Sequence, residues 1–199
     1  MPAPLLVVNK LCTYLQNGAE TVKAVDGISF TINKGETFCL VGESGSGKSI
    51  TALSVIRLLP YGIASHPNGQ LLFNNQDLLK VDEDELRTIR GSQIAMIFQE
   101  PMTSLNPVFT VGDQIMEALQ LHHPEMTAEE AEERAIQALD QVQMPNSRER
   151  LNSFPHQLSG GQRQRVMIAM ALACEPELLI ADEPTTALDV TVQAEILRL

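Results

Sequence analysis

The stretch that decides the fold is GESGSGKS, residues 42–49. Its glycines, lysine and serine match the spacing of a loop that wraps around a phosphate chain. Upstream, the apolar residues 37–41 predict a buried strand, and downstream the apolar positions of residues 50–59 predict a helix closed by Pro60. This pattern requires a loop between a strand and a helix, so we predict a phosphate-binding loop rather than a plain glycine-rich turn.

The chemistry of this loop follows from its residue types. Glycines let the backbone approach phosphate oxygens and turn several N–H groups inward, and the start of the following helix adds partial positive charge. We expect Lys48 to contact the β- and γ-phosphates and the Ser49 hydroxyl to bind Mg²⁺. The predicted nucleotide contacts are Gly42, Glu43, Ser44, Gly45, Ser46, Gly47, Lys48, Ser49 and Ile50.

Bulk properties narrow the class of protein. The chain has 199 residues, which suits one large domain or a domain with an insertion. Its formal net charge of −11 argues against a sequence-independent grip on nucleic acid. The start of the chain shows no secretory signal, and its longest apolar run is too short to span a bilayer, so we expect a chain that does not cross a membrane.

The order of patterns along the chain predicts an α/β fold. Strands are expected at residues 5–14 and 22–32, paired as an antiparallel sheet, and at residues 69–74, 93–99 and 177–181. Helices are expected after Asp82, across residues 111–144 with Thr127 and Glu130 as a capping box, over residues 162–174, and from about residue 191. We therefore predict a phosphate-loop NTPase core (1–100 and 174–199) that carries an N-terminal antiparallel β subdomain and a mainly helical insertion (101–173).

A second motif is LLIADE, residues 178–183. A buried strand that ends in an acid places the carboxylate at the sheet edge, where α/β folds bind ligands. Asp182 fits a carboxylate that helps hold Mg²⁺, and Glu183 fits a general base that polarises a water molecule. A strand that merely runs into an acidic loop is the alternative, and the phosphate loop upstream favours the functional interpretation.

A third motif is LSGGQ, residues 158–162, which precedes an apolar helix. Glycines and a serine at a helix N-terminus predict a second anion site. Two phosphate-binding elements on one chain allow two arrangements: both contact one nucleotide, or each serves a nucleotide on a different copy.

The combination GESGSGKS, LSGGQ and LLIADEP, in that order, resembles the ATP-binding cassette (ABC) ATPases. In that family two cassettes pack head to tail, and the LSGGQ of one closes on the ATP held by the other. The resemblance therefore implies ATP and Mg²⁺ as cofactors, a second cassette as partner, and contacts to the partner's nucleotide from Ser159, Gly160, Gly161 and Gln162.

Three further positions match the family. Tyr14 resembles the aromatic residue that stacks on adenine, although a tyrosine at a strand end can also serve packing alone. Gln99 resembles the glutamine that touches Mg²⁺ and the attacking water, with a merely polar strand end as the alternative. Asp189 resembles the residue that signals across the dimer. The family's switch histidine is expected further along than Leu199, so the sequence resembles a cassette that stops before the last strands of its core.

FQEPMTSLNP (98–107) and ADEPTTALDVTVQAEIL (181–197) resemble the importers for oligopeptides, dipeptides and nickel, including glutathione-type uptake. This resemblance implies an ATP-hydrolysing subunit, peripheral on the cytoplasmic face of the inner membrane, that powers import through a membrane permease. Residues 100–107 would line the permease contact, and a solute-binding protein would act indirectly. No nucleic acid is expected as a partner.

Other functions are less consistent with the sequence. A non-transport ABC ATPase of DNA repair, chromosome structure or translation would carry a coiled-coil, zinc-binding or long charged insertion, and none is visible. A phosphate-loop kinase or GTPase has no need of LSGGQ. A nucleotide-binding interaction module without turnover stays possible for this chain, because the switch histidine is not among its residues.

Overall fold

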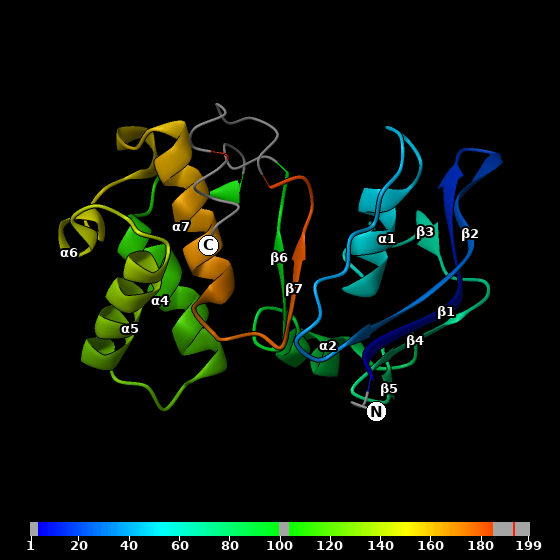
Figure 1. Cartoon of the computed structure of the whole chain (residues 1–199), viewed down its shortest axis with the longest axis horizontal. Helices are drawn as coiled ribbons and strands as arrows, with labels where there is room; N and C mark the ends of the chain where they lie inside the picture. Colours follow the sequence, from blue (N-terminus) through cyan, green and yellow to red (C-terminus); the bar gives the residue numbers. More distant parts are fainter. Residues whose placement is uncertain (1–3, 100–103, 185–192, 194–199) are drawn as a thin grey trace. The chain divides into compact units, whose positions relative to one another are not determined.

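The computed structural model describes residues 4–99, 104–184 and 193 (Figure 1). The chain forms two compact units, Met1–Arg87 and Thr88–Leu199, and the boundary falls inside helix α2 (Glu83–Ile89). The division expected from the sequence, a core at 1–100 and 174–199 with a helical part at 101–173, stays a prediction.

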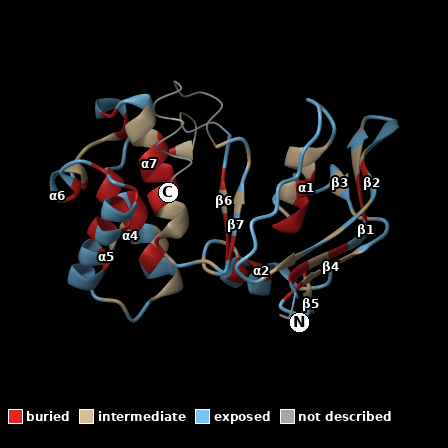
Figure 2. Ribbon diagram, in the orientation of Figure 1, coloured by how far each residue is buried: buried red, intermediate tan, exposed pale blue. Residues whose placement is uncertain are grey.

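The first unit contains a five-stranded antiparallel sheet in the order β2-β1-β4-β5, with the short strand β3 paired to β1 (Figure 1). The strands are β1 (Pro4–Asn17), β2 (Glu20–Asn33), β3 (Ala64–Ser65), β4 (Gln70–Phe73) and β5 (Gln76–Asp77). The predicted antiparallel pairing of residues 5–14 with 22–32 is confirmed, as is the strand at 69–74. Buried side chains of β1 and β4 form the core of this sheet, among them Leu6, Val8, Leu71 and Phe73 (Figure 2).

Helix α1 (Lys48–Val55) follows the phosphate loop and is shorter than the helix predicted at residues 50–59. It ends because Arg57 adopts a left-handed backbone conformation, with a φ of 49°. The Arg57 N–H donates to the Ser54 carbonyl, and the next N–H donates to the Leu53 carbonyl. These two bonds form a Schellman motif, which terminates the helix before the proline that the sequence suggested as the stop.

The prediction of a buried strand at residues 37–41 is wrong. The segment has no strand assignment, and Val41 is 89% exposed. Phe38 instead stacks on the Phe30 ring of β2, with 4.8 Å between the ring centres. An apolar run becomes a strand only where a neighbouring strand offers backbone partners, and among the described residues none pairs with this segment.

The second unit combines helices with a two-stranded parallel sheet (Figure 1). The helices are α4 (Val111–His122), α5 (Ala128–Gln141), α6 (Ser147–Arg150) and α7 (Gly160–Leu172), with a 3₁₀ turn, η1, at Pro155–Gln157. The predicted capping box of Thr127 and Glu130 starts α5. Fully buried side chains of α4, α5 and α7, including Ile115, Leu119, Leu139 and Val166, lie in one apolar core (Figure 2).

The parallel sheet consists of β6 (Ile94–Ile97) and β7 (Leu178–Ala181), which confirms the strands predicted at residues 93–99 and 177–181. In its register, Ile97 lies opposite Ala181. The Asp182 N–H then donates to the Ile97 carbonyl at 3.0 Å, which continues the pairing past the end of β7. The carboxyl ends of the two strands, each followed by a predicted site residue, therefore lie side by side.

The described helices include none that is both long and apolar enough to cross a membrane. The helix predicted from about residue 191 lies outside the described residues, apart from residue 193.

Candidate functional site

The phosphate loop of the first unit depends on glycine at two positions. Gly45 has a φ of 80° and Gly47 a φ of 91°, values that side-chain-bearing residues rarely adopt. Gly47 also lies directly against β2: a methyl group there would be 2.4 Å from the Ala24 carbonyl oxygen. The sequence pattern thus has a steric cause, because the loop turns sharply and passes close to a neighbouring strand.

Lys48 curls back over the loop that precedes it. Its ammonium nitrogen donates to the carbonyl oxygens of Gly42 at 3.0 Å and Glu43 at 3.1 Å. Both acceptors are neutral, and a phosphate oxygen in their place would form the stronger, charge-assisted bond. The ammonium therefore already lies against the backbone of the loop.

The start of α1 is suited to an anion. In this described part of the chain, no side chain caps the helix at Gly47 and no acidic residue lies in its first turn. Ser49 and Ile50 lie in that turn and are half-buried. The lack of a side-chain cap at Gly47 and the positive end of the helix dipole together favour a bound phosphate.

A buried chain of hydroxyl groups anchors α1 to β1. Ser54 donates to the Ile50 carbonyl at 2.6 Å, so its single hydrogen is used and the Thr13 hydroxyl must donate to Ser54, at 2.8 Å. His66 Nδ1, 3.1 Å from Thr13, must then carry the hydrogen that it shares with Thr13. Burial lowers the pKa of His66, which favours the neutral form of the ring.

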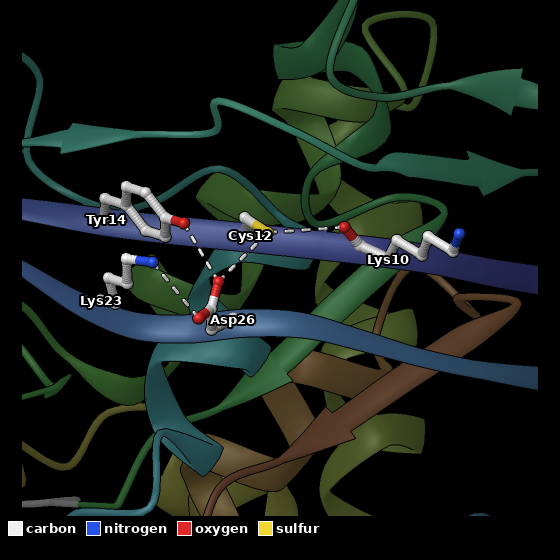
Figure 3. A network of polar contacts seen from close by, with 5 residues as sticks. All are labelled: Lys10, Cys12, Tyr14, Lys23 and Asp26. Carbon is white, nitrogen blue, oxygen red and sulfur yellow. Dashed lines mark hydrogen bonds and ion pairs between the residues drawn. The ribbon is translucent and has the colours of Figure 1, made fainter.

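Tyr14 follows Thr13 on β1 and is held by two residues of β2 (Figure 3). Its hydroxyl donates to Asp26 Oδ1 at 3.0 Å, and the Lys23 ammonium lies 5.3 Å from the ring centre. The hydrogen bond to Asp26 is the main reason why the pKa of Tyr14 is raised. These two contacts orient the ring on the sheet, in keeping with the predicted stacking role.

Gln99 and Glu183, predicted from separate motifs, meet in the second unit. The Gln99 side-chain amide donates to Glu183 Oε2 at 3.0 Å. Glu183 has a φ of 46°, a left-handed conformation that is uncommon outside glycine, and such strain concentrates at functional sites. Asp182 precedes it and is half-buried.

The LSGGQ segment begins α7. Ser159 is the N-cap: its hydroxyl oxygen accepts the Gln162 N–H, and the Gln162 side chain accepts the Ser159 N–H at 3.0 Å. The Ser159 hydroxyl hydrogen is not used in this capping box, so it can be donated outward. Ser159 and Gly160 are exposed, and a side chain at Gly160 would meet open space. Gly161, the next residue, is half-buried in the same turn.

The predicted Mg²⁺ ligands are distributed over both units: Ser49 belongs to the first, and Gln99 and Asp182 to the second. Hydroxyl, amide and carboxylate oxygens are the hard donors that Mg²⁺ prefers. Among residues 4–99, 104–184 and 193, no group of three or more His, Cys, Asp and Glu could hold a metal ion. Each of the three side chains carries an oxygen of the kind that Mg²⁺ accepts, and Mg²⁺ is usually held by few protein oxygens together with substrate phosphates. Asp189 lies outside the described residues.

Sequence reasoning missed several contacts around these residues. Asp26 and Lys23 were not singled out, although an antiparallel hairpin brings their strand beside Tyr14. Gln164 was also missed: it is 1% exposed on α7, and its side chain donates to the Pro184 carbonyl at 2.6 Å, one residue after Glu183. Gln164 lies in the polar run of residues 162–165, so the sequence carried no signal that its side chain is buried.

The chain belongs to the ABC transporter family, whose sequence profile matches residues 25–186. It is 58% identical over 196 residues to the peptidoglycan transport ATP-binding protein YejF of Agrobacterium fabrum, covering 98% of this chain and 36% of that protein. It is 56% identical over 179 residues to the dipeptide transport ATP-binding protein DppD of Bacillus subtilis, covering 90% of this chain and 53% of that protein. The chain thus spans about a third to a half of these two relatives.

Solved structures agree with this assignment. The chain superposes on the dimeric, ADP- and phosphate-bound structure of the ATP-binding cassette MJ0796 with a TM-score of 0.85 and 31% identity, covering 97% of this chain and 80% of that one. The α/β class predicted from the sequence is therefore the ABC cassette fold.

Proposed function

We propose that this chain is the ATP-binding and ATP-hydrolysing cassette of an importer for peptides or similar small solutes. The observation that carries the proposal is the phosphate loop, in which a left-handed Gly47 packs on β2 and leads into an uncapped helix. The transport relatives, one of which is named for dipeptides, support the choice of solute class.

In this proposal, Lys48 exchanges its carbonyl partners for the β- and γ-phosphates, and the backbone N–H groups of residues 42–50 surround the remaining oxygens. Mg²⁺, held by Ser49, Gln99 and Asp182, supplies charge neutralisation between the phosphates when it is bound. Tyr14 offers its ring to the adenine.

Glu183 is the proposed general base, and Gln99 positions it. The Gln99 amide donates to Glu183 Oε2 and so helps to orient the carboxylate that would accept a proton from the attacking water. The left-handed backbone at Glu183 is the kind of strain that is retained at functional sites, which supports this assignment.

A second cassette would complete the site. Ser159, Gly160, Gly161 and Gln162 would contact the nucleotide bound to the partner, with Asp189 signalling across the interface. Such a dimer would act on permease subunits from the cytoplasmic face of the membrane as a peripheral subunit, with a solute-binding protein acting indirectly through the permease. The solved cassette MJ0796 is a dimer bound to ADP and phosphate, which supports a second cassette as the partner.

Titration calorimetry with Mg-ATP tests the proposal. The wild-type chain should bind ATP. Lys48→Ala should bind it about 100-fold more weakly, because the variant loses the charge-assisted hydrogen bonds from the lysine ammonium to the phosphates. Thermal unfolding of both proteins controls for folding. A folded wild-type chain that binds no ATP would contradict the proposal.

A further inference from the structure

We propose that Asp26 is a positioning residue for the nucleotide base, because it fixes the Tyr14 ring before the nucleotide arrives. This inference rests on the proposed function, since it requires a nucleotide in the phosphate loop. Asp26 lies outside the three motifs. Through Tyr14 it would affect the part of the binding free energy that comes from the base, separately from the part that comes from the phosphates.

The Tyr14 side chain is restrained at its hydroxyl and on one ring face (Figure 3). The phenol donates to Asp26 Oδ1 at 3.0 Å, while the Lys23 ammonium contacts Asp26 Oδ2 at 3.5 Å and lies 5.3 Å from the ring centre. A hydrogen bond to a carboxylate is stronger than one to a neutral acceptor. The Lys23 ammonium thus contacts both the carboxylate and the ring.

Strand pairing places the carboxylate next to the Tyr14 hydroxyl. Tyr14 lies opposite Lys23, and Cys12 lies opposite Asp26, so Tyr14 and Asp26 are diagonal neighbours on the paired strands β1 and β2. The Cys12 thiol, on a buried side chain, also faces Asp26 Oδ1 at 3.8 Å. The carboxylate is therefore oriented from three directions, although its own side chain is 56% exposed.

The same part of the hairpin contacts the phosphate loop. Ala24, between Lys23 and Asp26 on β2, is the residue whose carbonyl packs against Gly47. On β1, Thr13 is bonded to Ser54 of α1 and precedes Tyr14. The ring and the phosphate loop are thus positioned by the same short stretch of two strands, which suits one ligand with a base at one end and phosphates at the other.

A ring that is already fixed loses less conformational freedom when a base stacks on it. Removal of the Asp26 carboxylate should therefore weaken only the base-dependent part of binding, by about threefold to tenfold. Electrostatics predicts the opposite sign, because loss of a negative charge near an anionic ligand should tighten binding of any phosphate chain. The two explanations are distinguishable by experiment.

The experiment measures the affinities of the chain for Mg-ATP and for Mg-tripolyphosphate by calorimetry, and takes their ratio as the contribution of the base. We expect Asp26→Ala to lower this ratio about threefold to tenfold, and Asp26→Asn, whose amide oxygen still accepts the phenol hydrogen, to retain most of it. Glu20→Ala removes a charge from the same hairpin as a matched control and should leave the ratio unchanged. Thermal unfolding verifies that each variant is folded.

A double-mutant cycle with Tyr14→Phe isolates the hydrogen bond. This variant keeps the ring and removes the hydroxyl, so it should lower the ratio as Asp26→Ala does, and the double variant should lower it no further. An unchanged ratio in Asp26→Ala, or additive losses in the double variant, would overturn the inference. Equal wild-type affinity for both ligands would exclude a base contact at Tyr14, and no wild-type affinity for either would overturn the proposed function itself.

Discussion

The replacement of Gly47 by alanine should damage the phosphate loop through two separate effects. The left-handed conformation, with a φ of 91°, costs an alanine about 1–2 kcal/mol. In addition, the new methyl group would lie 2.4 Å from the Ala24 carbonyl oxygen, closer than such carbon atoms are found in proteins. Because that neighbour is backbone, either the loop or β2 must shift.

The close contact with the Ala24 carbonyl weakens ligand binding if the loop, rather than β2, moves. If the loop moves by up to an ångström, the groups that contact the phosphates are misplaced. We expect this to lower the affinity for ATP about 100-fold, or about 2.7 kcal/mol. The losses in unfolding free energy and in ATP-binding free energy should therefore sum to about 4 kcal/mol. The sum matters because the protein can keep the strained loop at the cost of stability or relax it at the cost of affinity.

Gly45→Ala is the matched control. Gly45 has a similar φ of 80°, but a methyl group there would have no heavy atom within 4 Å. Its total loss should stay near the strain alone, about 1–2 kcal/mol. Chemical denaturation and calorimetry give the two quantities for each variant. Equal totals for the two alanines would refute the argument from close approach.

Three further predictions concern stability. Burial lowers the pKa values of His66 and His122, so near the ordinary histidine pKa the unfolded chain binds more protons than the folded chain. The unfolding temperature should therefore drop on acidification from pH about 7.5 to 5.5, and His66→Asn should reduce that drop. Gln164→Leu removes the hydrogen bond to the Pro184 carbonyl and should lower the free energy of unfolding, measured with denaturant, by about 1–3 kcal/mol. A smaller loss would show that this hydrogen bond contributes little to stability. Leu119→Ala, in the core of the second unit, should cost about 2–5 kcal/mol, and a near-neutral result would show that the core can collapse around the cavity.

Local signals in the sequence were sufficient for much of the fold. The antiparallel hairpin, the capping box at Thr127 and the strands before Gln99 and Asp182 depend on residues near one another in the chain, and the structure has them. The glycines of the phosphate loop were predicted for the same reason, since their backbone angles are a local property.

The remaining features depend on partners distant in sequence. Residues 37–41 are apolar enough for a strand, but no neighbouring strand in the described sheet pairs with them. The helix after the phosphate loop ends at Arg57, which adopts a left-handed conformation. Glycine or asparagine usually occupies such a position, so an arginine there gives no sequence signal for the end of the helix. The contact of Tyr14 with Asp26 depends on a register that contains irregularities beside Tyr14, and spacing alone does not reveal it.

In the proposed dimer, two copies share each nucleotide site, with the phosphate loop from one and LSGGQ from the other. Two variants test it in a Glu183→Gln background: Lys48→Ala, which disables the phosphate loop, and Ser159→Phe, which blocks the signature segment. Each alone should fail to dimerise with Mg-ATP in light scattering, whereas their mixture retains one intact composite site and should form ATP-dependent dimers. If the parent Glu183→Gln chain dimerises with ATP but the mixture stays monomeric, the shared site is contradicted.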